Sequence, residues 1–406
     1  MRARVLAAIA GLSTVIWMAV PVTAAAAASP QTFTIGVDHA DPANQQLDAN
    51  GVPTTPPGVQ PKVFEYTDFF TRSLKVHQGD TVDFRFAIPD HLIQVASNEA
   101  AARQQLPLFT PDERTATEGN ALGSGGPKIV LGPAVFLGFS GAGPDCGTLD
   151  NKCVFDGSGP SAPGFVGSSP DWLVQINVAP GTYTYFCHLH PGMRGSLKVV
   201  PNNAAVQSQN QIDRESATQF RRDQREAVAL YDEANQVDAQ QENSGPAVYN
   251  VHVGVTSRDR HIAIHDMLPS KLSVKPGDIV HYHWQTNVIH TVEFAPISPF
   301  GADCETSYAP LTSSSGLPVC PSGALEFNEP SPPLAPFEVI GDSGSQAPGA
   351  LLTDTSDSGL IVGASYAPYY GGLGADHWSV KAGSIGAHQY FCAIHDWMTG
   401  TITVGS

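Results

Sequence analysis

Two short stretches of the chain carry a cysteine, a histidine and a methionine at one spacing, Cys-x-x-His-x-x-Met, directly after the dipeptide Tyr-Phe. The six residues are Cys187, His190, Met193, Cys392, His395 and Met398. A thiolate, an imidazole and a thioether are ligands that suit copper in both of its common oxidation states. One more imidazole from a neighbouring strand would complete a mononuclear copper site in each half, with the thioether as a weak axial ligand.

A histidine stands shortly after a Gly-Asp pair in both halves of the chain. His91 follows Gly79 and His290 follows Gly277, and the two offsets differ by one residue. Each Gly-Asp pair lies between two β-patterned runs, so the histidine is expected at the end of the second strand. We therefore predict that His91 and His290 complete the two sites. The alternative is a reduced buried cysteine beside an ordinary histidine and a core methionine, which a single Cys-x-x-His motif would not exclude.

The motifs belong to longer internal repeats. Residues 74–82 are similar to residues 272–280, and residues 181–195 are similar to residues 386–400. In the second pair the glycine, tyrosine, phenylalanine, cysteine, histidine and methionine coincide without a gap, and so does the closing glycine. A short β-patterned run follows each copy and predicts a final strand. The chain is therefore expected to contain two similar domains.

The composition agrees with two β-rich domains. The chain has 406 residues, with 39 Gly and 33 Pro, and only 15% of its residues are charged. That balance is typical of all-β proteins with many turns and long loops. The formal net charge of −17 repels nucleic acid and anionic membranes, so neither is an expected partner, and a basic or neutral protein is favoured.

The N-terminal segment has the pattern of an export signal. Arg2 and Arg4 precede a mostly apolar run, and residues 24–28 are all alanine. We predict that residues 1–28 are a cleaved signal peptide, with a retained membrane anchor as the alternative. Because no later segment is long and apolar enough to span a bilayer, the mature protein is expected to be soluble and secreted, or otherwise extracytoplasmic.

The six cysteines fall into two kinds. Cys146 and Cys153 lie close together in a Gly/Asp-rich stretch, and Cys304 and Cys320 lie in a similar stretch of the second half. Close loop pairs in an oxidising compartment predict disulfide bonds. The two cysteines of the Cys-x-x-His-x-x-Met motifs are left over, and metal ligation would explain why they stay unpaired.

Residues 207–241, between the repeats, differ in composition from the rest of the chain. They are rich in Gln, Glu, Asp, Arg and Ala, and apolar side chains recur among them at roughly helical spacing. We predict a linker helix, either docked through a thin apolar stripe or solvated and frayed. Two long inserts, residues 99–170 and 297–376, are rich in Gly, Pro, Ser and Ala, and connections of that length are usually functional or disordered.

On the two Cys-x-x-His-x-x-Met loops and the upstream histidines, the halves resemble cupredoxins of the plastocyanin and pseudoazurin type. The resemblance implies an all-β fold of two tandem Greek-key β-sandwiches, each with copper at one end. The expected boundaries are residues 30–202 for domain 1, 203–245 for the helical linker and 246–406 for domain 2. The resemblance implies one copper ion per domain, held by His91, Cys187, His190 and Met193 and by His290, Cys392, His395 and Met398.

Two features depart from the pattern of that family. Only two residues separate the histidine from the methionine in each loop, fewer than in plastocyanin, and this would alter the axial bond. Leu92 follows the upstream histidine of the first half, whereas Thr291 follows that of the second.

Other histidines leave alternatives open. His281 and His283 alternate along a predicted strand and therefore share one face of it. With His252, His261 or His265 they would form another metal site, or all of them are solvent-facing or supporting imidazoles, since their spacing is not diagnostic.

A coupled copper cluster of the multicopper oxidase type is not indicated. His188 directly follows Cys187, as in the electron-relay arrangement of that class, but Phe186 precedes it. Such a cluster also needs paired His-x-His motifs from several segments. The chain has two, and one of them shares His190 with the predicted copper site.

Three functions fit the residues. The first is an electron carrier that exchanges electrons with another exported redox protein through an exposed edge of His190 or His395. The second is copper binding without redox traffic, for buffering or in a structural envelope protein. The third is an enzyme of the copper nitrite reductase or two-domain multicopper kind, for which His188 is the candidate coupling residue. We favour the carrier over an enzyme, so no catalytic residues are predicted.

Overall fold

The computed structural model describes most of the two predicted domains and the helix between them. The described residues are 29–39, 64–87, 91–105, 109–111, 129–131, 146–163, 171–241, 245–294, 338–339, 350–352, 358, 361–369, 377–392, 395 and 398–405. The predicted signal peptide and the predicted Cys304–Cys320 pair lie outside them. Among the described residues no helix is long and apolar enough to cross a membrane.

The N-terminal half, domain 1, is built from two facing sheets. Its strands are β1 (Thr32–Val37), β3 (Phe69–Phe70), β4 (Ser73–His77), β5 (Thr81–Phe86), β6 (Ile93–Ala96), β9 (Cys153–Phe155), β10 (Asp171–Ile176), β11 (Gly181–Cys187) and β12 (Arg194–Val200). One sheet has the order β3-β1-β5-β10-β9 and the other the order β4-β12-β11-β6. Alternate side chains of both sheets form one buried core, which includes Phe33, Phe84 and Trp172.

The C-terminal half, domain 2, also has two sheets. Its strands are β13 (Ala239–Gln241), β14 (Ala247–Thr256), β15 (Ala263–Leu268), β16 (Lys271–Val274), β17 (Ile279–Gln285), β19 (Ala350–Leu351), β20 (His377–Lys381), β21 (Gly386–Phe391) and β22 (Thr399–Val404), and it contains the 3-10 helix η3 (Ala364–Tyr369). The smaller sheet has the order β16-β22-β21. The larger has the order β19-β20-β17-β14-β15-β2, with β13 added on β14.

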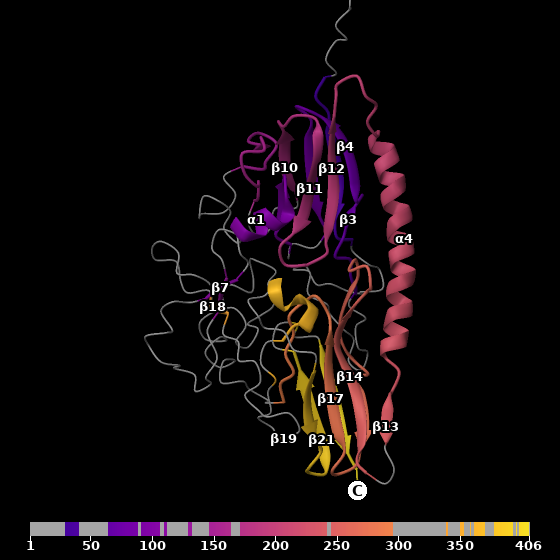
Figure 1. The fold of residues 1–406 in the computed structure, drawn as a ribbon. Coiled ribbons are helices and arrows are strands. Elements are labelled where there is room, and N and C mark those ends of the chain that lie inside the picture. Colours follow the sequence, from indigo (N-terminus) through magenta and orange to yellow (C-terminus); the bar gives the residue numbers. More distant parts are fainter. Residues whose placement is uncertain are drawn as a thin grey trace, which may run out of the picture.

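The last strand of that larger sheet comes from the N-terminal part of the chain. Strand β2 (Phe64–Glu65) pairs antiparallel with β15, with Glu65 opposite Ala263. A short piece of the range predicted for domain 1 therefore completes a sheet of domain 2. In Figure 1 the two halves are stacked end to end.

The Gly-Asp turns have the same construction in both domains. Gly79 and Gly277 have φ values of +94° and +95°, a conformation that glycine adopts without strain. The carboxylate of Asp80 accepts the backbone N–H groups of Gln31 and His77, at 2.8 and 2.7 Å. Asp278 accepts two backbone N–H groups in the same way, at 2.9 and 2.8 Å. Each turn therefore ties its strand to the start of the parallel neighbour, β1 for β5 and β14 for β17.

The tyrosines and glycines shared by the two Cys-x-x-His-x-x-Met stretches are explained by cross-strand packing. Tyr185 lies opposite Gly195 in the β11–β12 pair, and Tyr390 lies opposite Gly400 in the β21–β22 pair. A Cβ atom on either glycine would come within 2.0 or 2.1 Å of the tyrosine ring. Glycine therefore leaves the space in which each ring covers its neighbouring strand.

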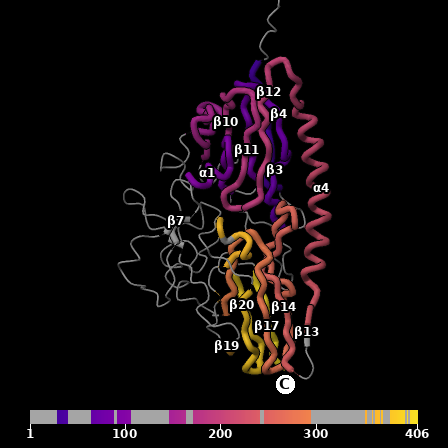
Figure 2. Tube along the Cα trace, in the orientation of Figure 1, coloured from indigo at the N-terminus to yellow at the C-terminus, as the bar shows by residue number. Residues whose placement is uncertain are grey.

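The linker helix α4 (Gln209–Ala234) is docked on both domains. It begins with a capping box formed by Ser208 and Gln211. Ile212, near its start, joins the core of domain 1. Ala227, Tyr231 and Ala234, near its end, pack in a cluster with side chains of β2 and β15. Of the two interpretations of the polar segment, the docked one is correct, and Figure 2 shows the helix running alongside both halves.

The inserts are described in part. Helix α1 (Glu99–Gln105) and the disulfide between Cys146 and Cys153 belong to the first insert, and the disulfide confirms the predicted pairing. Strands β7 (Phe109–Pro111), β8 (Ile129–Leu131) and β18 (Glu338–Val339) form a small sheet that joins the first insert to the second.

The docking of α4 predicts a pH-dependent stability. Burial raises the pKa of Asp266 to about 7, although the N–H of Met267 and the hydroxyl of Tyr231 donate to it. The folded state therefore binds the proton more tightly than the unfolded state, and stability falls as pH rises towards 7. Relative to wild type, Asp266→Asn should gain on the order of 2–3 kcal/mol in unfolding free energy between pH 5 and pH 8.

Urea unfolding of both proteins at the two pH values measures this difference. Asp213→Asn, which removes an exposed carboxylate of α4, is the matched control and should follow wild type. A pH-independent difference between Asp266→Asn and wild type would contradict the raised pKa of Asp266.

Candidate metal centres

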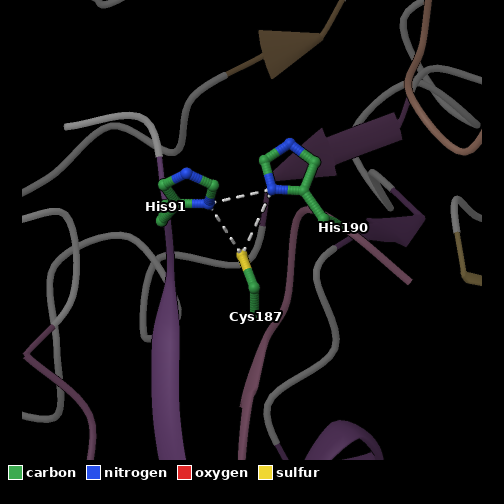
Figure 3. Close-up of side chains that lie close together, drawn as sticks. All are labelled: His91, Cys187 and His190. Carbon is green, nitrogen blue, oxygen red and sulfur yellow. Dashed lines mark hydrogen bonds between the residues drawn. The ribbon is translucent and has the colours of Figure 1, made fainter. Parts of the chain in front are cut away.

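In domain 1 the structure brings three of the four predicted ligands together at the end facing domain 2. Cys187 ends β11, His190 follows in the loop before β12, and His91 lies just before β6. The Sγ of Cys187 is 3.8 Å from Nδ1 of His91 and 3.5 Å from Nδ1 of His190, and the two Nδ1 atoms are 3.1 Å apart. Figure 3 shows both Nδ1 atoms turned towards the sulfur and both Nε2 atoms turned away from it.

These separations fit a single metal ion. Metal–sulfur bonds of about 2.3 Å and metal–nitrogen bonds of about 2.0 Å, the lengths found for zinc with the same ligands, place sulfur and nitrogen about 3.7 Å apart in a trigonal plane. The two nitrogens would be about 3.5 Å apart in that plane, and closer when the angle between them narrows. The donor set of two imidazoles and a thiolate suits copper.

Domain 2 has the same arrangement. The Sγ of Cys392 is 3.8 Å from Nδ1 of His290 and 3.7 Å from Nδ1 of His395. The backbone N–H of Thr291 also points at this sulfur, at 3.4 Å. A donor at that position stabilises a thiolate over a thiol.

The two ligand loops are held by matching backbone hydrogen bonds. In domain 1 the N–H of Cys187 donates to the carbonyl of Met193 at 3.0 Å, and the N–H of Met193 donates to that of His190 at 3.0 Å. The loop of domain 2 repeats both bonds, at 2.9 and 2.8 Å. Met193 and Met398 are fully buried, each in the core cluster that contains the cysteine of its own loop.

Two carboxylates contact the outer nitrogens of the domain 1 histidines. Nε2 of His91 is 3.3 Å from Oδ2 of Asp38, and Nε2 of His190 is 3.1 Å from Oε1 of Glu65. Since a carboxylate only accepts, each contact favours the tautomer with the proton on Nε2 and the lone pair on Nδ1. The carboxylates therefore prepare Nδ1, the atom that faces the sulfur, for metal binding.

Glu65 also connects the two centres across the domain boundary. Its other oxygen, Oε2, is hydrogen-bonded to Nε2 of His265 on β15. The ring of His265 stacks on that of His395, with centroids 4.6 Å apart and an interplanar angle of 22°. A continuous contact path therefore runs from His190 through Glu65 and His265 to His395.

His265, His290 and His395 also bring one nitrogen each within 4.8 Å of the others. A shared ion would have to lie in the plane of every ring, because the imidazole lone pair lies in that plane. The nearly parallel stack of His265 on His395 places no point in both planes at bonding distance. The geometry therefore favours His265 as a support for His395 over a third ligand beside it.

Burial keeps the ligand imidazoles neutral. It lowers the pKa of His190, His290 and His395 well below the ordinary value, and the neighbouring histidines lower each of them further. A neutral imidazole has the lone pair that a metal needs, so little proton displacement opposes binding.

The expectation of an exposed His190 edge is wrong. Only 4% of His190 is exposed, because its outer nitrogen meets Glu65 and the neighbouring Pro191 carbonyl accepts a hydrogen bond from Asn287 of domain 2 at 3.2 Å. Domain 2 covers this end of domain 1. The ring of His395, the other expected edge, is partly exposed.

His188 lies apart from the ligands. It is buried beside Phe186, with ring centroids 5.2 Å apart, and burial lowers its pKa to about 3, with a smaller contribution from the charge of Arg103. The guanidinium of Arg103 also donates to the carbonyls of Cys187 and His188, at 2.7 and 3.3 Å. Among the described residues, His188 joins no group of potential metal ligands.

Sequence reasoning missed Asp38 and Glu65 and did not place His265. None of the three belongs to a repeated motif or has a diagnostic spacing. The one signal for Glu65 was a charged residue between the aromatics Phe64 and Tyr66, a pattern that buried strands rarely carry without a partner.

The chain has no match to a protein-family model or to a curated protein, whereas solved structures do match. Dithionite-reduced auracyanin from Roseiflexus castenholzii is 16% identical, and the match covers 43% of this chain and 99% of auracyanin at a TM-score of 0.21. A copper-containing nitrite reductase from Thermus scotoductus is 12% identical over 82% of this chain and 59% of its own, at 0.17. A blue copper oxidase from Nitrosomonas europaea is 9% identical over 93% and 86%, at 0.18.

The structural neighbours are thus single-domain cupredoxins, each matching less than half of the chain, and larger copper enzymes that match most of it. At these identities and TM-scores the likeness carries no argument about function. The fold itself is all-β, in two successive sheet pairs.

Glu65→Gln tests the role of the bridging carboxylate. A glutamine amide accepts through its oxygen and donates through its NH₂ group. One of the two histidines must therefore face the NH₂ group, and this favours the tautomer of that histidine with the lone pair on Nε2. If that histidine is His190, its Nδ1 carries the proton and no longer binds a metal. We expect copper affinity at the domain 1 site to fall by about 10- to 100-fold.

Chelator competition followed by the thiolate absorption in a Cys392→Ser background measures this affinity, because that background leaves the domain 1 set as the only complete cysteine site. Asp171→Asn, which removes a carboxylate of β10 paired with Arg85, is the control and should bind copper as the background does. Equal affinities in Glu65→Gln and in this control would show that Glu65 has no part in the site.

Gly254→Ala tests the packing of the domain 2 site. Gly254 lies at an irregularity of β14 with a φ of +70°, and a Cβ there would be 2.6 Å from Nε2 of His290. The methyl group should displace His290 and lower copper affinity at the domain 2 site by at least about tenfold, while the domain 1 site keeps its ion.

Gly277→Ala is the matched control. It imposes similar backbone strain at a φ of +95°, yet its Cβ meets nothing within 4 Å. Copper stoichiometry and chelator competition distinguish the two variants. If both lose the same affinity, strain and not contact with His290 is the cause.

Proposed function

We propose that the chain is an exported copper protein that transfers electrons through one mononuclear copper site in each domain. The supporting observation is that two Cys-His-His sets, far apart in the sequence, are each arranged at separations that fit one ion. The proposed ligands are His91, Cys187, His190 and Met193 in domain 1 and His290, Cys392, His395 and Met398 in domain 2.

Copper bound by such ligands supplies one-electron chemistry between Cu(I) and Cu(II). The protein contributes a rigid and dry surrounding. Cys187 and Cys392 are fully buried, and backbone hydrogen bonds fix both loops before any ion binds. Rigid ligands lower the rearrangement that accompanies a change of oxidation state, which favours electron transfer.

The contact path between the sites supports electron transfer over copper buffering. A buffer must release its ion, but His190 and His290 are buried between the domains, with 4% and 0% of their surfaces exposed. The contacts of Glu65 with His190 and with His265 join the two sites through close contacts of polar side chains. Two connected sites with most of their ligands buried fit exchange of electrons better than exchange of ions.

The proposed partner is another exported redox protein. The net charge of −17 favours a partner with a basic surface and speeds its approach at low ionic strength. Because His190 is covered by domain 2, the partner would dock elsewhere than on the His190 edge.

Copper loading and absorption spectroscopy test the proposal. Wild type should bind two copper ions at its cysteine sites and develop an intense blue or green colour, since a thiolate–Cu(II) bond supplies the transition. Cys187→Ser and Cys392→Ser should each lose about half of the colour, and the double variant should lose all of it.

Electron exchange with a small redox carrier then separates a carrier from a buffer. Reversible reduction of both sites supports the proposal. A copper-loaded protein that is colourless, or whose colour is unchanged in the double variant, would rule it out, and a coloured protein that the carrier cannot reduce would favour buffering.

A further inference from the structure

Four histidines form a second cluster on the outer face of domain 2. His252, His283 and His377 lie in register on the adjacent strands β14, β17 and β20, so that each is the direct neighbour of the next. His281 lies two residues before His283 on β17 and points to the same face. The predicted partners His261 and His265 lie elsewhere, and His377 was not foreseen.

The face that carries these rings is opposite the core. Val251, Val253, Tyr282 and Trp378, the residues that alternate with the histidines, are buried in the core of domain 2. His377 is exposed, and the other three histidines are partly exposed. An ion from solution therefore has access to the rings.

Three of the rings lie close to one another, and the fourth, His252, lies close to His283. Their centroids are separated by 6.0 Å for His281 and His283, 5.9 Å for His281 and His377, and 6.3 Å for His283 and His377. His252 is 6.4 Å from His283. Two imidazoles bound to one ion through nitrogen, at about 2.0 Å, have centroids about 5–6 Å apart, so the rings of His281, His283 and His377 would have to rotate towards a shared ion.

A hydrogen-bond relay fixes the tautomer of the central histidine. Nδ2 of Asn250 donates to Oδ2 of Asp238 at 2.8 Å, because a carboxylate only accepts. The amide oxygen of Asn250 therefore faces His283 and accepts its Nε2 proton, also at 2.8 Å. The lone pair of His283 is left on Nδ1, as it is in metal sites whose histidines are oriented by a second layer of residues.

The surroundings suit a cation. Burial lowers the pKa of His252, His281 and His283, and neighbouring histidines lower those of His281 and His283 further, which keeps these rings neutral. Nδ1 of His252 has no hydrogen-bond partner among the described residues. The carboxylates of Asp238 and Glu233 lie near enough to act on His252 and add negative charge to this face.

From this geometry we infer that His281, His283 and His377, with His252 beside His283, form a third metal site, which binds a divalent transition-metal ion without sulfur. Imidazole ligands suit copper, nickel and zinc, and among divalent ions of this series Cu(II) binds most strongly. Being open to solvent, the site would exchange its ion faster than the two buried sites.

The test uses protein already saturated with copper at its cysteine sites. Further Cu(II) is added and followed by calorimetry and electron paramagnetic resonance. We expect one more Cu(II) per chain, with nitrogen ligands and no gain in the thiolate absorption. His281→Gln/His283→Gln should weaken this binding by at least about tenfold. His388→Gln, on β21 of the opposite sheet, is the matched control and should leave it unchanged.

The absorption of the cysteine sites reports whether the double variant folds. If it does not fold, His377→Gln, which changes only an exposed ring, should still weaken the binding. Unchanged Cu(II) binding in the folded His281→Gln/His283→Gln and His377→Gln variants, or no additional Cu(II) in wild type, overturns the inference. The readout is the difference in Cu(II) binding between these histidine variants and wild type. Its outcome therefore does not depend on whether the cysteine sites transfer electrons.

Discussion

The carboxylate of Glu65 is the contact on which both the domain arrangement and the site depend. It is buried between His190 of domain 1 and His265 of domain 2, and strand β2 brings it there by pairing with β15. A buried carboxylate without partners costs several kcal/mol, and contact with both domains gives Glu65 a hydrogen bond from His265 and an ion-pair contact with His190. Closure of the domains therefore covers His190 and places a carboxylate beside its outer nitrogen.

This closure separates what each site builds from its own loop and what the other domain adds. The ligand loops have their own backbone hydrogen bonds and need no second domain. The outer edge of His190, in contrast, meets Glu65 and lies under domain 2. His265 stacks on His395 and so belongs to the surroundings of the second site while hydrogen-bonding to the carboxylate of the first. The two centres thus share one supporting network, in which His190 is covered and His395 is partly exposed.

Local chemistry explains which features the sequence predicts. Gly79, Gly277 and the tyrosine–glycine pairs recur because turns and cross-strand packing act over short distances. Cys187 and His190 lie three residues apart, so one loop brings them together. Asp38, Glu65 and His265 reach the boundary only through tertiary contacts, and a two-residue strand such as β2 has no periodicity to detect. The prediction of an exposed His190 edge was wrong for the same reason, because a local pattern contains no information on which other segments cover it.

The cysteine sites and the outer histidine cluster on β14, β17 and β20 differ in how readily they would release an ion, and this difference follows from solvent access. At the boundary, ligands fixed by backbone hydrogen bonds and covered by a second domain would hold an ion through many redox cycles, since release requires the domains to part. On the outer face of β14, β17 and β20, the rings are partly exposed and need to rotate before they converge. Such ligands would bind more weakly and release readily. One chain thereby offers retained and exchangeable positions to the same metal, separated by the core of domain 2.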